Sequence, residues 1–314
     1  MQEKLTKFGK VRETVEKQSK SYHDEIVPLK DVHFDSLKSV RIGDQQHPLR
    51  MHAGMGMCAR LQVPFQYLSR CNAELQAINL NYWVEKQKAN SSDLFIRFDG
   101  DEVRAVFSKR YIPIDHIQIL DELHSLGIES DADIQCYMDD KFMMLNIPSP
   151  SKKFALLKKD EVMPGTSVSN SEVGLASFSV AAFMLRLICT NGMISKSHMA
   201  KTSYRHVSTK VLKQLPTILL DATSNLDLLT HSLKEAIKVK VEDPEEKIIE
   251  LNEQYLLNDN QKEAVAWAFP QEIKKTNSMY NIIQTYTRAV QHQSLSAQEQ
   301  YQLQEVGGKI ASNF

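Results

Sequence analysis

The feature that most constrains the fold is a pair of β-rich runs separated by a tight-turn signal. Residues 94–98 and 103–108 read LFIRF and VRAVFS, and Asp99-Gly100 lies between them. Aromatic and β-branched residues favour strands, and Asp-Gly favours the positive φ angles of a two-residue hairpin turn. We therefore expect an antiparallel hairpin at 94–108.

The middle of the chain repeats this pattern. The runs IQCYM and KFMMLNI, within residues 134–147, flank Asp139-Asp140, and further apolar runs follow around 153–157 and 175–188. The strands do not alternate regularly with helices, as strands do in a parallel sheet. The sequence therefore predicts a second hairpin and an antiparallel sheet through this region.

Helical patterns surround these strands. Asn72 is placed to cap a helix that runs to about residue 87. Four large side chains of this helix share one face and are predicted to be core: Leu75, Ile78, Tyr82 and Trp83. The spacing of apolar residues at 114–126 predicts another amphipathic helix.

From Val207 onward the pattern is helical. Apolar residues at intervals of three and four form a seam that faces either a core or a partner helix: Leu219, Ala222, Leu226, Leu229, Leu233 and Ala236. Asp243-Pro244 is expected to start the next helix. Pro270 is expected to end the segment that contains Trp267 and Phe269. Gly307-Gly308 in the last helix predicts a site that frays or packs closely.

The predicted fold class is α+β, in which short helices precede an antiparallel sheet built from hairpins and a helical C-terminal third begins at about residue 207. Residues 1–24 are predicted to be a basic N-terminal arm or a peripheral helix, because residues 1–20 hold six lysines and arginines against three acidic residues. Residues 25–314 are predicted to form a single α+β domain.

Composition excludes several function classes. Thirty-eight basic and 39 acidic residues give a net charge of −1, so no global field attracts the chain to a polyanion. No apolar run approaches the roughly 20 residues of a membrane helix, and the charged N-terminus predicts a cytoplasmic protein, within the host cell, with no membrane partner. Scattered cysteines and histidines predict no metal site, and missing nucleotide-binding and hydrolase motifs predict no cofactor.

Basic and aromatic residues nevertheless gather in two segments. Residues 193–240 hold eight lysines and arginines against three acidic residues, which indicates either a solvated face or a surface for phosphates. In the first part of this segment Tyr204 lies among four residues expected to contact nucleic acid: Lys196, Lys201, Arg205 and His206.

The hairpin at 94–111 is the second candidate for nucleic-acid binding. Its cations Arg97, Arg104 and Arg110 lie beside aromatic residues that include Tyr111. Strand alternation places Arg104 and Val103 on opposite faces, so we expect Arg104 to point outward if Val103 points inward. An exposed arginine on a strand can equally be solvated with no ligand.

A third cluster lies at 167–174, SVSNSEVG. Glu172 is a candidate general base, with Arg186 and His206 as the other members of a pocket, and an ordered turn at Gly174 is the alternative. Whether the chain is an enzyme stays open at this point.

Several motifs in a fixed order resemble a family of phage and plasmid-like proteins with a domain of unknown function that recurs on mobile elements. They are LQVPFQYLSRC at 61–71, VRAVFSKRYIPIDH at 103–116, NSEVG at 170–174 and RLICTNGM at 186–193. The resemblance covers roughly residues 25–312. It implies an association with mobile DNA and no defined activity.

These observations lead to one leading hypothesis. The chain is expected to be a nucleic-acid-binding protein of phage or plasmid DNA metabolism, as a single-strand DNA binding or annealing factor that works as a homo-oligomer. The alternative is a non-catalytic interaction protein that binds a host factor, which the near-zero net charge and the seam at 219–236 favour.

Overall fold

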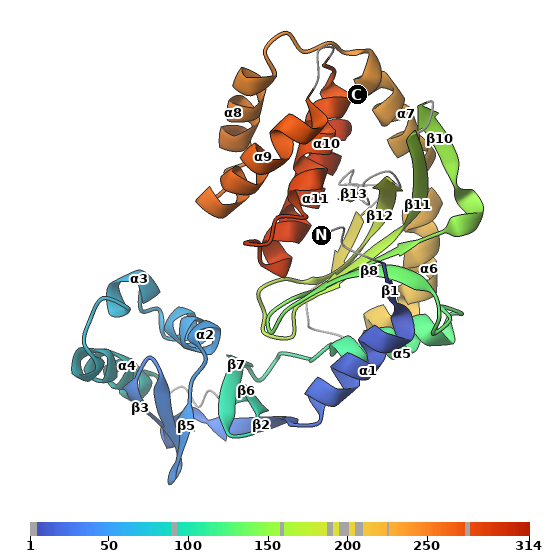
Figure 1. Ribbon diagram of the computed structural model, residues 1–314. Helices are drawn as coiled ribbons and strands as arrows, with labels where there is room; N and C mark the ends of the chain where they lie inside the picture. Colours follow the sequence, from blue (N-terminus) through green and yellow to red (C-terminus); the bar gives the residue numbers. More distant parts are fainter. Residues whose placement is uncertain are drawn as a thin grey trace.

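The middle of the chain forms an antiparallel sheet that carries helices on both of its faces (Figure 1). This computed structural model describes residues 5–88, 93–157, 160–186, 191–194, 201–204, 210–224, 226–273 and 277–314. The order of the main strands is β1-β8-β9-β11-β12-β13, with β10 added on β11 and β14 on β12. The predicted α+β class, with antiparallel sheets and a helical C-terminal part, is confirmed.

The strands of this large sheet include the predicted second hairpin. Its hairpin strands pair in register around the turn at Asp139-Asp140, and Met138 lies opposite Met143. The bounds of the eight strands are β1 (Thr6–Lys7), β8 (Asp133–Met138), β9 (Met143–Pro148), β10 (Phe154–Leu157), β11 (Asp160–Asn170), β12 (Phe178–Arg186), β13 (Asn191–Ile194) and β14 (Lys201–Tyr204).

Each face of the large sheet has its own hydrophobic core, because alternate side chains of a strand point to opposite faces. Leu145 and Val168 pack with α1 (Phe8–Ser19), α5 (His116–Ser125) and α6 (Lys210–Ser224). Met144 and Phe183 pack on the other face, against the C-terminal helices. These helices are α7 (Leu226–Lys238), α8 (Pro244–Gln254), α9 (Asp259–Glu272), α10 (Met279–Ala289) and α11 (Ala297–Ala311).

Residues 22–108 form a separate group of elements with a third core, which we call the N-terminal module (Figure 1). It holds the predicted first hairpin, β6 (Asp93–Asp99) and β7 (Glu102–Ser108), with β2 (Tyr22–Pro28) along β6. The other elements are β3 (Val32–Ser36), β4 (Ser39–Ile42), β5 (Gln45–Pro48), α2 (Met51–Leu61), α3 (Phe65–Leu68) and α4 (Ala73–Lys88); short 3-10 turns at Leu29–Asp31 and Pro150–Lys152 complete the chain.

The predicted core face of α4 is wrong. Leu75, Ile78, Tyr82 and Trp83 are all exposed, while Leu80 and Val84 on the opposite side of the same helix are buried. Asn72 does cap the helix, since its side-chain oxygen accepts a hydrogen bond from the Leu75 amide at 2.9 Å. The predicted position of the helix is therefore confirmed, but the face that is buried is the one that carries Leu80 and Val84.

The seam at 219–236 spans two helices and two cores. Leu229, Leu233 and Ala236 lie on α7 and are buried in the core of the C-terminal helices. Leu219 lies on α6 and packs against the core on the other face of the sheet. The described part of the seam therefore faces the interior of this chain.

The predicted start of α8 is confirmed, and the predicted end of α9 is shifted by two residues. Asp243 caps α8 by accepting a hydrogen bond from the Glu246 amide, and α9 runs two residues past Pro270 before it ends. The segment 1–24 contains α1, whose Phe8, Val11 and Val15 are buried. In the described part of the chain, no helix has the length and hydropathy that crossing a membrane requires.

Candidate functional site

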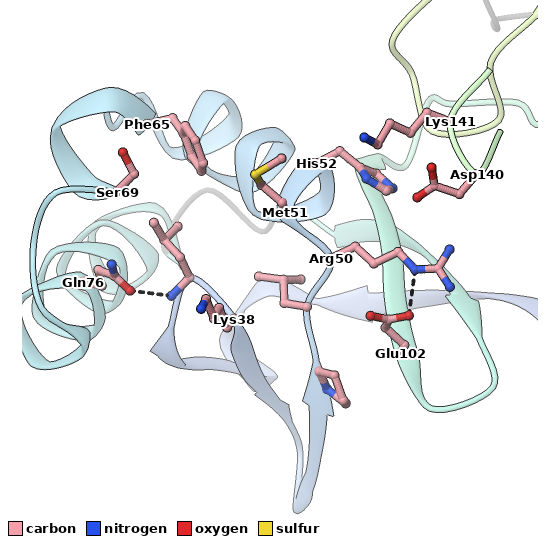
Figure 2. A pocket seen from close by; sticks show the side chains of 13 residues that line it. Lys38, Arg50, Met51, His52, Phe65, Ser69, Gln76, Glu102, Asp140 and Lys141 are labelled. Carbon is pink, nitrogen blue, oxygen red and sulfur yellow. Dashed lines mark hydrogen bonds and ion pairs between the residues drawn. The ribbon is translucent and has the colours of Figure 1, made fainter. Parts of the chain in front are cut away.

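A cavity of about 660 Å³ lies at the edge of the N-terminal module (Figure 2). The module supplies most of its lining, from β5, α2, α3, α4 and β7. Asp140 and Lys141, in the turn between β8 and β9, close the remaining side. The site is therefore built by two parts of the fold, and a hairpin turn of the large sheet completes it.

Arg50, directly before α2, is fixed at the charged end of this cavity. Its Nε lies 2.7 Å from Glu102 Oε2, and its Nη2 lies 2.6 Å from Asp99 Oδ2. Burial alone would lower the pKa of Arg50, but the hydrogen bonds to the two carboxylates raise the pKa above its usual value. Arg50 is thus a positioned cation whose charge is already balanced within the protein.

His52 is the most unusual group in the lining. Its side chain is only 7% exposed, and its Nε2 has no hydrogen-bond partner among the described residues. Burial lowers the pKa of His52, and the charges of Lys141 and Arg50 act in the same direction, so the ring is neutral at pH 7. Nε2 is buried beneath the surface that lines the cavity, and no described residue satisfies it.

An apolar wall lies beside these polar groups. Phe65 of α3 and Met51 of α2 point toward the centre of the cavity, away from Arg50 and Glu102 (Figure 2). Lys38 and Lys141 supply further cations from different sides, and neither forms an ion pair with a described carboxylate. The cavity thus combines an apolar surface, one buried acceptor and two lysines.

A smaller hollow of about 350 Å³ continues the site, because it shares Arg50 and Asp140 with the larger one. Lys17 of α1 and Tyr22 of β2 line it on the far side. Together the two hollows form a path along the edge of the N-terminal module. No group of three metal-binding side chains that could hold an ion occurs among the described residues.

Behind this path lies a buried polar network centred on Glu172. Glu172 Oε2 lies 2.7 Å from Arg104 Nη2, and the backbone N–H of His116 donates to Oε1 at 2.6 Å. Burial opposes ionisation of Glu172, but His116 and Arg104 hold its pKa at about 2. Burial lowers the pKa of His116 itself, so Glu172 is charged and His116 is neutral at pH 7.

Arg97 belongs to the same network. It is 3% exposed, and its guanidinium contacts Asp24 at 2.9 Å and Asp115 at 2.5 Å. Its Nη1 also donates to the backbone carbonyl of Glu172 at 3.3 Å. The structure therefore places Arg97 where it joins segments of the fold, away from solvent.

The expected outward orientation of Arg104 is wrong. Arg104 is 2% exposed, and its guanidinium stacks on the Tyr22 ring at 3.7 Å. The cause is a β-bulge: Arg97 pairs with Ala105 and Phe98 with Val103, which leaves Arg104 without an opposite residue. A bulge redirects the side chain of the extra residue, so simple alternation fails at this position.

The other predicted site residues are scattered. Tyr111 stacks on Phe107 with ring centroids 3.7 Å apart, and Arg110 is exposed. Arg186 pairs with Glu272 at 2.9 Å, whereas Glu172 pairs with Arg104, so these two pocket candidates have different partners. For two more predicted residues, Lys201 and Tyr204 in β14, the structure describes only the backbone. The remaining predicted residues lie outside the described part of the chain: Lys196, Arg205 and His206.

Sequence reasoning missed the residues of the cavity. Arg50 and His52 lie in the segment LRMHAG, where no spacing marks a site, and Lys38 is one of many surface lysines. Lys141 begins the run KFMMLNI, which predicts a strand and marks no site. These residues come together through contacts between distant segments, for which the sequence gives no local signal.

One comparison identifies related proteins. A family described as a domain of unknown function, DUF932, matches residues 103–307, which is more than half of the chain. Asp140 and Lys141 lie inside the matched region, and Lys38, Arg50 and His52 precede it. No curated protein and no solved structure gives a significant match.

Proposed function

The chain belongs to the DUF932 family, and we propose that it is a nucleic-acid-binding protein whose cavity holds one nucleotide of a single strand. The observation that carries this proposal is a cavity with an apolar wall and two lysines, beside which lies the buried, unpartnered Nε2 of His52. The resemblance to phage and plasmid-like proteins supports a role in mobile-DNA metabolism, as a single-strand binding or annealing factor.

The size of the cavity suits a nucleotide. Small-ligand sites typically measure about 300–1,000 Å³, and this cavity of about 660 Å³ lies within that range. Phe65 and Met51 offer an apolar surface for the face of a base, and base stacking on an aromatic ring contributes about 1–3 kcal/mol.

The polar groups suit the other parts of a nucleotide. The proposal pairs the buried Nε2 of a neutral His52 with an amino or imino N–H on the edge of a base, which requires the ring to turn so that this atom faces the cavity. Lys38 and Lys141 are available for phosphates, because no described carboxylate pairs with them. Arg50 is already neutralised by Asp99 and Glu102, so it positions the site and adds little net charge.

This chemistry favours single strands over duplexes. The base edge that His52 would read is paired in a duplex, and the base face that Phe65 would meet is stacked there. An unpaired strand presents both without the cost of flipping a base, which is a few kcal/mol.

Fluorescence anisotropy with a labelled single-stranded DNA oligonucleotide tests the proposal. The wild-type protein should bind at low salt, and His52→Ala should weaken binding about tenfold, as expected for the loss of one buried hydrogen bond. Lys141→Ala should also lower the salt slope by about 0.7, as one fewer phosphate is neutralised. Lys262→Ala, an exposed lysine on α9, is the matched control and should bind like wild type.

The alternative remains a non-catalytic interaction protein that binds a host factor. The burial of Arg97 and Arg104 favours it, since two predicted phosphate contacts are engaged inside the fold. It predicts no binding to single- or double-stranded DNA or RNA at any salt concentration, together with specific recovery of one host protein on the immobilised chain.

A further inference from the structure

A cluster of four polar side chains interrupts the apolar core between α11 and the large sheet. Gln135 of β8, Asn146 of β9 and Ser167 of β11 lie in a row, because the register pairs Asn146 with both of the others. Gln304 of α11 lies over this row, since Asn146 Nδ2 donates to Gln304 Oε1 at 3.0 Å. None of the four side chains is more than 3% exposed. Met144, the next residue of β9 on the same face, belongs to the apolar core.

Three atoms of this cluster have no hydrogen-bond partner in the described part of the chain. They are Asn146 Oδ1, Gln304 Nε2 and Ser167 Oγ, and all three are shielded from solvent. Turning both amide groups over would again leave one donor and one acceptor unused, so the deficit does not depend on how the amides are oriented. An unpaired buried polar atom costs free energy, so three of them together indicate a bound guest that supplies the missing bonds.

A second polar cluster in the same interface provides a contrast. Ser169 Oγ lies 2.7 Å from Ser179 Oγ, which in turn lies 3.3 Å from Tyr301 OH. These hydroxyl groups satisfy one another within the protein. Tyr301 precedes Gln304 by about one turn of α11, so both clusters lie under the same helix. Among the described residues of this interface, the unpaired atoms therefore belong to the cluster around Asn146.

We propose that this cluster is a binding site for one water molecule, held by Asn146, Ser167 and Gln304. Water donates two hydrogen bonds and accepts two. It donates to Asn146 Oδ1, accepts from Gln304 Nε2 and shares a third bond with the Ser167 hydroxyl. Buried waters in proteins typically make about three hydrogen bonds to polar groups that otherwise have no partner, as this site requires.

The chemistry of the three side chains excludes other small guests. None of them carries a charge, so an ion would lie in the core without an opposite charge among its ligands, which is costly. An apolar guest would leave the donor and the acceptor unpaired. A neutral molecule that both donates and accepts satisfies the site, and water is the smallest such molecule.

A crystal structure of the full chain, at a resolution that shows ordered water, tests the proposal. It should show a water molecule within hydrogen-bond distance of Asn146 Oδ1 and Gln304 Nε2, with Ser167 Oγ as the third ligand. The proposal is overturned by a cluster without this water, or by one in which the three atoms bond to protein groups instead.

Magnetic relaxation dispersion of the water oxygen counts long-lived internal waters in solution and gives an independent test. The double variant Asn146→Leu/Gln304→Leu should hold one long-lived water fewer than wild type, because leucine supplies neither a donor nor an acceptor. Ser169→Ala, in the second cluster, is the matched control and should keep the wild-type count. An unchanged count in a double variant that circular dichroism shows to be folded would also overturn the proposal. If the double variant does not fold, the crystal structure of wild type decides the question.

Discussion

Arg104 and Glu172 form a buried ion pair, 2.7 Å from Nη2 to Oε2, that links β7 of the N-terminal module to the segment between β11 and β12. Both side chains are almost completely buried. The pair fixes the module against the large sheet, and Arg50 and His52 on the module side meet Asp140 and Lys141 on the sheet side. It therefore positions the cavity without lining it.

Removing one partner of this pair should be strongly destabilising. We expect Glu172→Gln or Arg104→Met to lower the free energy of unfolding by about 3–5 kcal/mol, because each leaves a buried polar or charged group uncompensated. The double variant should lose less than the sum of the single changes, and urea denaturation of all four proteins measures the difference. Strictly additive losses would contradict the pairing.

The same carboxylate makes stability depend on pH in the acid range. The pKa of Glu172 is about 2 in the folded protein against 4.5 for an unperturbed glutamate. A depressed carboxyl pKa contributes stability that is present above about pH 4.5 and is lost as the pH falls toward 2. Urea unfolding at intervals across that window should show this loss, and Glu172→Gln should reduce its slope. An unchanged slope would exclude Glu172 as its source.

Two buried histidines should make the free energy of unfolding depend on pH in a higher range than Glu172 does. Burial lowers the pKa of both His52 and His116 below 6.5, so the unfolded chain takes up protons that the folded chain does not. The stability from these neutral rings is present above pH 6.5 and falls as the pH drops below that value. His116→Gln should flatten the decline between pH 6.5 and 5, and an unchanged decline would exclude His116 as its source.

Close packing of α11 on α10 depends on Gly307. A methyl group at this position would lie 2.7 Å from Thr287 Cγ2, closer than atoms in contact can lie. We expect Gly307→Ala to lower the thermal midpoint, at a cost of about 1–3 kcal/mol in unfolding free energy. Thr287→Ser removes the opposing methyl group and should restore most of the loss. A thermal midpoint of Gly307→Ala equal to that of wild type would show that the two helices move apart at little cost in free energy.

Local patterns predicted several of the elements. The hairpins at β6–β7 and β8–β9 follow from turn residues between β-rich runs, and the start of α8 follows from Asp243-Pro244. These signals act over a few residues, so they do not depend on the rest of the fold. Gly307-Gly308 predicted either fraying or close packing, and the close approach of Gly307 to Thr287 shows close packing.

Orientation was harder to predict than location. On α4 the larger apolar residues are exposed, because Leu80 and Val84 face the module core and Leu75 and Ile78 face outward. Periodicity describes which residues share a face but does not say which face is covered within one chain. On β7 a single bulge turned Arg104 inward, and no residue type in that strand signals a bulge.

The cavity depends on contacts that the sequence does not encode locally. The fold of the module brings Lys38 near His52, and the docking of the β8–β9 turn on the module adds Lys141. The sequence prediction instead followed clusters of cations along the chain, and two of those cations are held in internal ion pairs.

The most direct test of the account is the affinity of wild type and His52→Ala for one single-stranded DNA oligonucleotide, measured by anisotropy at the same low salt concentration. The account predicts binding by wild type, about tenfold weaker binding by folded His52→Ala and unchanged binding by Lys262→Ala. Equal affinity of wild type and His52→Ala, or no binding by wild type, would contradict the assignment of this cavity as a nucleotide site.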